Sequence, residues 1–98
     1  MNYAEFSDSL MADAPPEGLS EPLAALWLVA RDRWSDAHET VRELTRPDYA
    51  WVHAYLHHVE GVIWNADYWY RTAGRKRPSC SLQEEWEQIA RELLKDVG

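Results

Sequence analysis

Apolar side chains recur every three or four positions along most of this chain, which is the period of an amphipathic α-helix. The pattern predicts a short helix within residues 2–11 and longer helices over residues 20–31, 34–45, 49–60 and 62–73. A final helix, residues 81–97, carries the clearest apolar stripe, formed by Leu82, Trp86, Ile89, Ala90, Leu93, Leu94 and Val97. No long stretch alternates with period two, so we expect an all-α protein.

Residues with strong backbone preferences mark the ends of these helices. Ser20 is a suitable N-cap, and Gly61 is placed to end the helix that precedes it. Ser81 and Glu84 form the S-x-x-E capping box that opens the final helix. Because the connections are short, neighbouring helices should run antiparallel within a single domain of residues 1–98.

The two helices joined at Gly61 resemble a tetratricopeptide repeat, which is a hairpin of two antiparallel helices. The residues that match the family's small, aromatic and closing positions are Ala54, Ala66, Tyr70, Ala73 and Pro78. The preceding pair of helices matches more loosely. The resemblance implies an array of about two helix hairpins over residues 20–78, preceded by an N-terminal segment, residues 1–19, and covered by residues 81–97 as a capping helix.

The resemblance also implies a function, because the first helix of each hairpin in this family lines a concave surface that binds extended peptides. The matching positions here are Trp51, Tyr55 and His58. We therefore expect a small interaction domain that binds a protein partner or a second copy of itself. The alternative is that the N-terminal segment or a second subunit already covers these three side chains.

Three of the four histidines fall on helix faces that should be buried. His53 and His57 are one helical turn apart, at positions that face the sister helix in the family, and His38 lies on the apolar side of its own helix. The simplest interpretation is structural, with each neutral imidazole bonded to a carbonyl, a hydroxyl or a carboxylate. The alternative is a metal- or small-molecule-binding site formed by all three, in which Glu60 or Asp67 adds an oxygen to a metal. A further alternative is acid–base catalysis by a histidine with Asp67 or Glu60.

The charge distribution limits the possible partners. The chain has 17 acidic and 10 basic residues, a net charge of −7, which argues against a general nucleic-acid binder. The basic residues Arg71, Arg75, Lys76 and Arg77 nevertheless form one cluster. They either complement a helix C-terminus or bind an anion or an acidic partner, such as the acidic N-terminal segment of a second copy.

The remaining features indicate a protein without membrane or cofactor chemistry. The single cysteine and the absence of a signal peptide or a long apolar run predict a cytoplasmic protein, and the preference for Arg over Lys suggests a bacterial source. No phosphate-binding loop, catalytic triad spacing or carboxylate pair is present, so we assign no catalytic residue and no cofactor. We expect most tryptophans to lie in the core: Trp27, Trp34, Trp64, Trp69 and Trp86.

Overall fold

Six α-helices and one short 3-10 helix form over residues 1–95, the part of the chain that the computed structural model describes, and no strand forms there. The elements are α1 (Tyr3–Asp8), η1 (Ser9–Met11), α2 (Glu21–Ala30), α3 (Trp34–Val41), α4 (Pro47–Glu60), α5 (Ile63–Thr72) and α6 (Leu82–Lys95). The predicted all-α class is confirmed. Val97, the last member of the predicted apolar stripe, lies outside the described residues. None of the helices within residues 1–95 is long and apolar enough to cross a bilayer.

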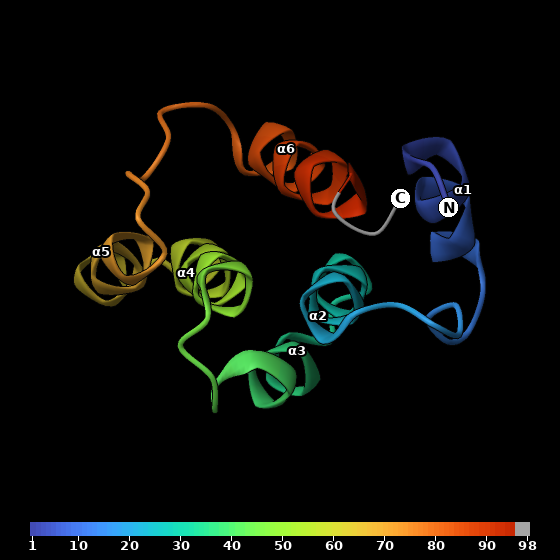
Figure 1. Ribbon diagram of the computed structural model, residues 1–98, viewed down its shortest axis with the longest axis horizontal. Coiled ribbons are helices and arrows are strands. Elements are labelled where there is room, and N and C mark those ends of the chain that lie inside the picture. The colour runs from blue at the N-terminus through green and yellow to red at the C-terminus, as the bar shows by residue number, and fades with distance from the viewer. Residues whose placement is uncertain (96–98) are drawn as a thin grey trace.

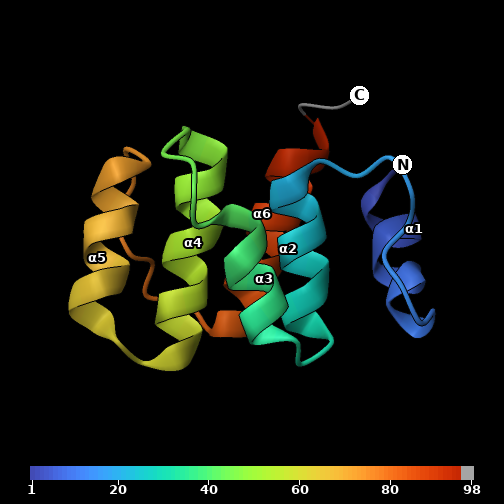
Figure 2. The same cartoon turned by 90° about the horizontal axis from the view of Figure 1, so that it is seen from below.

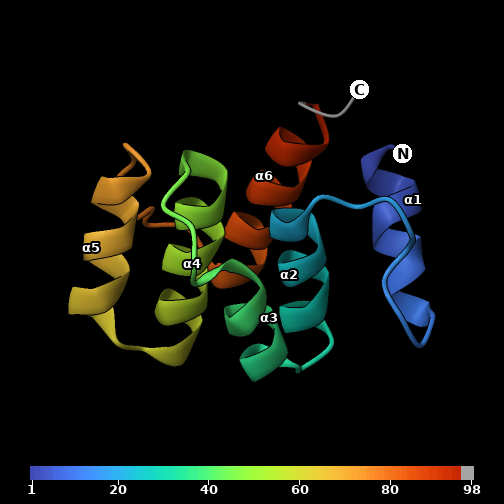
Figure 3. The same cartoon turned by 60° about the horizontal axis from the view of Figure 1, so that its bottom comes forward.

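Two antiparallel hairpins, α2 with α3 and α4 with α5, make up most of the fold. Helices α2 and α4 lie at its centre, with α3 packed on one side of them and α6 on the other (Figure 1). Helix α5 stands at one end of the row and α1 at the other (Figures 2 and 3). The final helix covers apolar surface of α2, α4 and α1. It lies on the face of α2 and α4 and does not cap the end of the array at α5.

Aromatic contacts and small residues fix these positions. Trp86 of α6 stacks on Phe6 with ring centroids 5.7 Å apart, and its indole nitrogen donates a hydrogen bond to the carbonyl of Leu26 at 2.8 Å. Within the hairpins, Ala37, Ala54 and Ala66 are fully buried. Because a methyl group occupies little space, these alanines let the helix axes approach closely.

The sequence signals for helix ends are confirmed at three places. Ser20 accepts a hydrogen bond from the backbone of Leu23. Ser81 caps α6 by accepting one from the backbone N–H of Glu84, and its hydroxyl donates to the Glu84 carboxylate. Gly61 ends α4 with a φ of 87°, in the left-handed region that favours glycine.

Two expectations about packing are wrong. The helix predicted over residues 34–45 ends at Val41, and residues 42–46 connect it to α4, which Pro47 opens. Trp64 was expected in the core, yet it is 75% exposed. Helix α5 packs mainly against α4, so only one face of it is buried, and Trp64 lies on another face.

We predict that Gly61 is required for its backbone conformation alone. A Cβ at Gly61 would meet no atom within 4 Å, so a substitution causes no steric clash with other residues. Its only cost is the free energy of holding a residue other than glycine in the left-handed conformation, roughly 1–2 kcal/mol. G61V should lower the free energy of unfolding by about that amount in urea titrations, and G61N should lower it less because asparagine tolerates this region. Equal stability of G61V and the unaltered protein would contradict the assignment.

Candidate metal centre

Helices α3 and α4 bring three imidazoles together. His53 and His57 project from successive turns of α4, and His38 reaches them from α3. One nitrogen of each ring lies within 4.8 Å of the others. His53 is only 4% exposed, His57 is also buried, and His38 is half-buried. The three histidines identified from the sequence thus form one cluster inside the fold.

Two tryptophans enclose this cluster. Trp34 stacks on His38, one turn further along α3, with ring centroids 4.9 Å apart and planes at 10°. Trp69 of α5 stacks on His53 with centroids 4.0 Å apart. The indole nitrogen of Trp34 also donates to the carbonyl of Leu56 at 2.8 Å, which holds that ring in place. The indoles therefore limit both the movement of the imidazoles and their contact with water.

The hydrogen bonds of the cluster differ from those expected of purely structural histidines, in which each imidazole would bond to a carbonyl, a hydroxyl or a carboxylate. Nε2 of His38 and Nε2 of His53 are 3.1 Å apart, so one of them donates to the other. Nδ1 of His53 is buried and has no hydrogen-bond partner among residues 1–95. An unpaired buried polar atom costs roughly 1–3 kcal/mol. His57 is the member with a carboxylate partner, since its Nδ1 lies 3.0 Å from Oε1 of Glu60.

Burial favours the neutral form of two of these imidazoles, His53 and His38. Desolvation, together with the neighbouring His38 and His57, lowers the pKa of His53 to about 3. The pKa of His38 is lowered as well, first by desolvation and then by His57. A neutral imidazole carries the lone pair that binds a metal ion, so His38 and His53 are held in the protonation state that a ligand requires.

The nitrogen positions fit a tetrahedral ion with little movement. Zinc–nitrogen bonds of about 2.0–2.1 Å at tetrahedral angles place two ligand nitrogens about 3.3 Å apart. His38 and His53 are already at 3.1 Å. The widest separation in the cluster is at most 4.8 Å, so closing it around an ion requires side-chain shifts of about 1 Å.

The two carboxylates considered as oxygen ligands have other roles. Oε1 of Glu60 lies beside Nδ1 of His57. Metal-binding histidines typically have such a carboxylate at the ring nitrogen that does not bind the metal. Asp67 accepts a hydrogen bond from Nε of Arg77 at 2.8 Å and does not belong to the cluster. The expectation that Asp67 is a ligand is therefore corrected, because its ion pair holds it on another part of α5.

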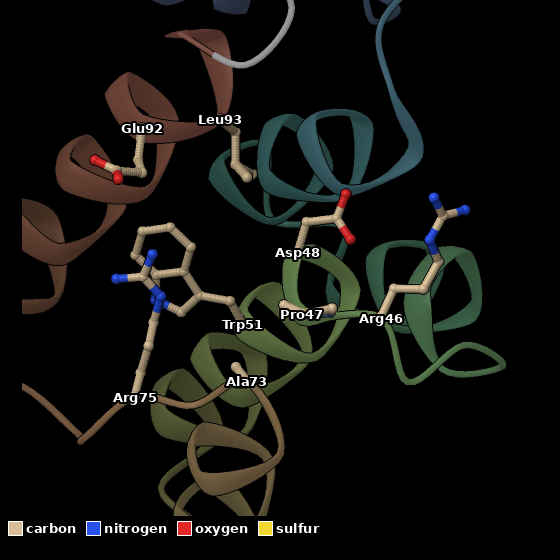
Figure 4. A pocket seen from close by; sticks show the side chains of 8 residues that line it. All are labelled: Arg46, Pro47, Asp48, Trp51, Ala73, Arg75, Glu92 and Leu93. Carbon is tan, nitrogen blue, oxygen red and sulfur yellow. The ribbon is translucent and has the colours of Figure 1, made fainter.

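The predicted basic cluster is a separate feature. Its members Arg71, Arg75, Lys76 and Arg77, with Asp67 and Tyr70, line one hollow of about 260 Å³. The guanidinium of Arg75 lies 3.4 Å from the centre of the Trp51 ring, on a second hollow of about 340 Å³ (Figure 4). Arg71 lies in the last turn of α5, and Arg75, Lys76 and Arg77 follow its C-cap at Ala73. Anion binding here stays a prediction.

The residues expected to bind a peptide are covered. Trp51 and Tyr55 are 8% and 5% exposed, and Nδ1 of His58 lies 2.8 Å from Oε1 of Glu85 on α6. The apolar stripe of α6 needs a partner, and α4 provides it. This burial argues against an open groove at Trp51, Tyr55 and His58, and their role in partner binding stays a prediction.

The sequence analysis missed side chains from other helices that contact the histidine cluster, and it also missed a second polar cluster formed by His58, Tyr70 and Glu85. Asn65 places Nδ2 3.3 Å from Nε2 of His57, and Trp69 covers His53. Buried Glu85 accepts a hydrogen bond from the hydroxyl of Tyr70 and pairs with His58. No local pattern marks these residues, because their roles depend on which helices meet.

Comparison of the chain with protein-family models, curated proteins and solved structures finds no match. The tetratricopeptide resemblance therefore depends on the quoted residues alone, and function has to be inferred from the geometry of the fold.

We predict that the metal-free protein loses stability in acid through His53. Below pH 6.5 the unfolded chain binds a proton at this imidazole, whereas the folded protein does so only near pH 3. Folding therefore becomes less favourable as the pH falls through this window, by roughly 1 kcal/mol per pH unit. Urea titrations between pH 4 and 7 with chelator should show a shallower loss for H53F, which keeps a ring against Trp69. Equal slopes for H53F and the unaltered protein would contradict this cause.

Proposed function

We propose that this protein is a metal-binding helical domain that holds one divalent transition-metal ion on His38, His53 and His57. The observation that supports this function is the convergence of three imidazoles from two helices, with one nitrogen of each ring within 4.8 Å of the others. Core histidines placed only for packing are expected to have their nitrogens bonded to protein groups.

The donor atoms indicate the class of ion. Imidazole nitrogen suits zinc, copper, nickel and iron, whereas magnesium and calcium require oxygen ligands. The cluster contains three nitrogens and no sulfur, which favours divalent ions over copper(I). Zinc and its spectroscopic substitute cobalt(II) are therefore the first ions to test.

Metal binding would act on the whole fold through the position of the site. His38 belongs to the α2–α3 hairpin, and His53 and His57 belong to the α4–α5 hairpin. An ion shared between them links the two hairpins, and its binding free energy adds to the stability of the folded state. A chain of this size buries a limited share of its surface, so such a link is a substantial contribution.

We predict that chelator-treated protein binds one zinc ion per chain. At about 100 times the dissociation constant, bound zinc should stabilise the fold by about 2.7 kcal/mol. For a domain of this length that corresponds to a rise in melting temperature of roughly 10–20 °C. Calorimetric titration gives the stoichiometry and affinity, and a thermal scan followed by circular dichroism gives the shift.

Four glutamine variants provide the controls. Loss of a residue that only orients a ligand weakens metal binding roughly 10–100-fold. H38Q, H53Q and H57Q each remove a ligand and should weaken zinc binding by more than that. H58Q is the matched control, because His58 follows His57 on the same helix and faces Glu85. It should keep the affinity of the unaltered protein. Absence of binding by the unaltered protein, or equal weakening by H58Q, would refute the proposal.

The interaction function implied by the tetratricopeptide resemblance is a second candidate, favoured by an exposed apolar patch. The patch covers the outer side of α5 and the end of α4 and contains Val59, Ile63, Trp64 and Tyr68. Helix hairpins of repeat proteins stack on a neighbour, and two hairpins are fewer than such arrays usually contain. A second copy of this chain packed on α5 would supply that neighbour.

If a second copy packs on α5, we predict that the protein forms a dimer whose stability depends on Trp64. Sedimentation equilibrium should show self-association of the unaltered protein and a monomer for W64E, because a charge at the centre of an apolar contact opposes its burial. M11E is the control, since Met11 is also exposed but lies on η1, away from the patch. A monomeric unaltered protein, or the same dimer in W64E, would count against this candidate.

A further inference from the structure

Asn65 is the one residue of α5 that hydrogen-bonds to the histidine cluster within residues 1–95. Its Nδ2 lies 3.3 Å from Nε2 of His57. The partner of the other ring nitrogen of His57, Nδ1, determines which atom donates in this hydrogen bond. The ionised carboxylate of Glu60 can only accept, so Nδ1 of His57 carries a proton. In the neutral form of the ring, which is the form that binds metal ions, Nε2 is then bare. The amide of Asn65 therefore donates to Nε2.

The acceptor in this bond is the lone pair that a metal ion would use. An ion and an N–H group cannot both occupy it, so metal binding has to turn the donor of Asn65 away. A half-turn of the terminal amide exchanges its nitrogen for its oxygen with almost no change in shape. After that rotation Oδ1 occupies the place where Nδ2 was.

The distance places that oxygen within reach of a coordination position. Two ligands of a tetrahedral zinc ion are about 3.3 Å apart, and the Asn65 amide atom lies 3.3 Å from Nε2 of His57. To bind beside that nitrogen, the oxygen has to move sideways, off the lone-pair axis that the ion takes. We propose that Oδ1 of Asn65 is the fourth ligand of the ion, beside His38, His53 and His57. This inference depends on the proposed metal-binding function and specifies the coordination of the same site.

The surroundings favour a protein ligand over an open position. Trp34 and Trp69 occupy the space on two sides of the imidazoles. The hollows described on the surface of residues 1–95 are lined by other residues. Four protein ligands are typical of an ion with a structural role, whereas catalytic sites keep one position for water or substrate. The ion would then join α3, α4 and α5.

Cobalt(II) titration followed by visible absorption tests the fourth ligand. The unaltered protein should give the intense bands of tetrahedral cobalt, and added azide should leave them unchanged because no position is open. N65L keeps the size of the side chain but removes the oxygen. It should bind cobalt about 10–100-fold more weakly, and azide should shift its spectrum. N65D, which supplies a charged oxygen, should restore both affinity and insensitivity to azide.

E60Q is the matched control, because Glu60 orients His57 without ligating the ion. It should bind more weakly than the unaltered protein and remain insensitive to azide. The inference is overturned if N65L keeps the affinity and spectrum of the unaltered protein, or if azide alters the spectrum of the unaltered protein. Absence of any cobalt spectrum in the unaltered protein refutes the metal site itself, which is a distinct result.

Discussion

The burial of α4 on nearly every side is the constraint on which the rest of the molecule depends. Its residues from Tyr49 to His57 are buried without interruption, because α2, α3, α5 and α6 all pack against it. A helix in this position is normally apolar all round. Here it carries imidazoles, and each one has to find partners inside the protein. The polar chemistry of the fold is therefore concentrated along one central helix.

The two neighbours His57 and His58 show how this helix separates two polar clusters. His57 belongs to the histidine cluster with His38 and His53, whereas His58 faces Glu85 on α6. Burial and the hydrogen bond to Glu85 raise the pKa of Tyr70 far above its usual value, so its hydroxyl stays protonated and donates to the buried carboxylate. The second cluster is thus satisfied by protein groups, whereas the first leaves a nitrogen of His53 unpaired.

The sequence predicted the local features of this fold well and the long-range ones poorly. Capping at Ser20 and Ser81 and the turn at Gly61 depend on neighbouring residues, so they could be identified directly. The approach of His38 to His53 was expected from helical faces, but the contribution of Asn65 was not, because it depends on how two helices align after the turn. Burial of Trp51 and exposure of Trp64 depended likewise on where α6 and α5 come to lie.

The position of α6 has a consequence for any ligand of the face formed by α2 and α4. A segment tethered to its own binding surface competes at an effective concentration in the millimolar range, set by the length of its linker. Trp86 anchors that segment by stacking on Phe6 and bonding to Leu26. An external peptide could reach this face only by removing α6, and with it the buried Trp86, Ile89 and Leu93, from the core.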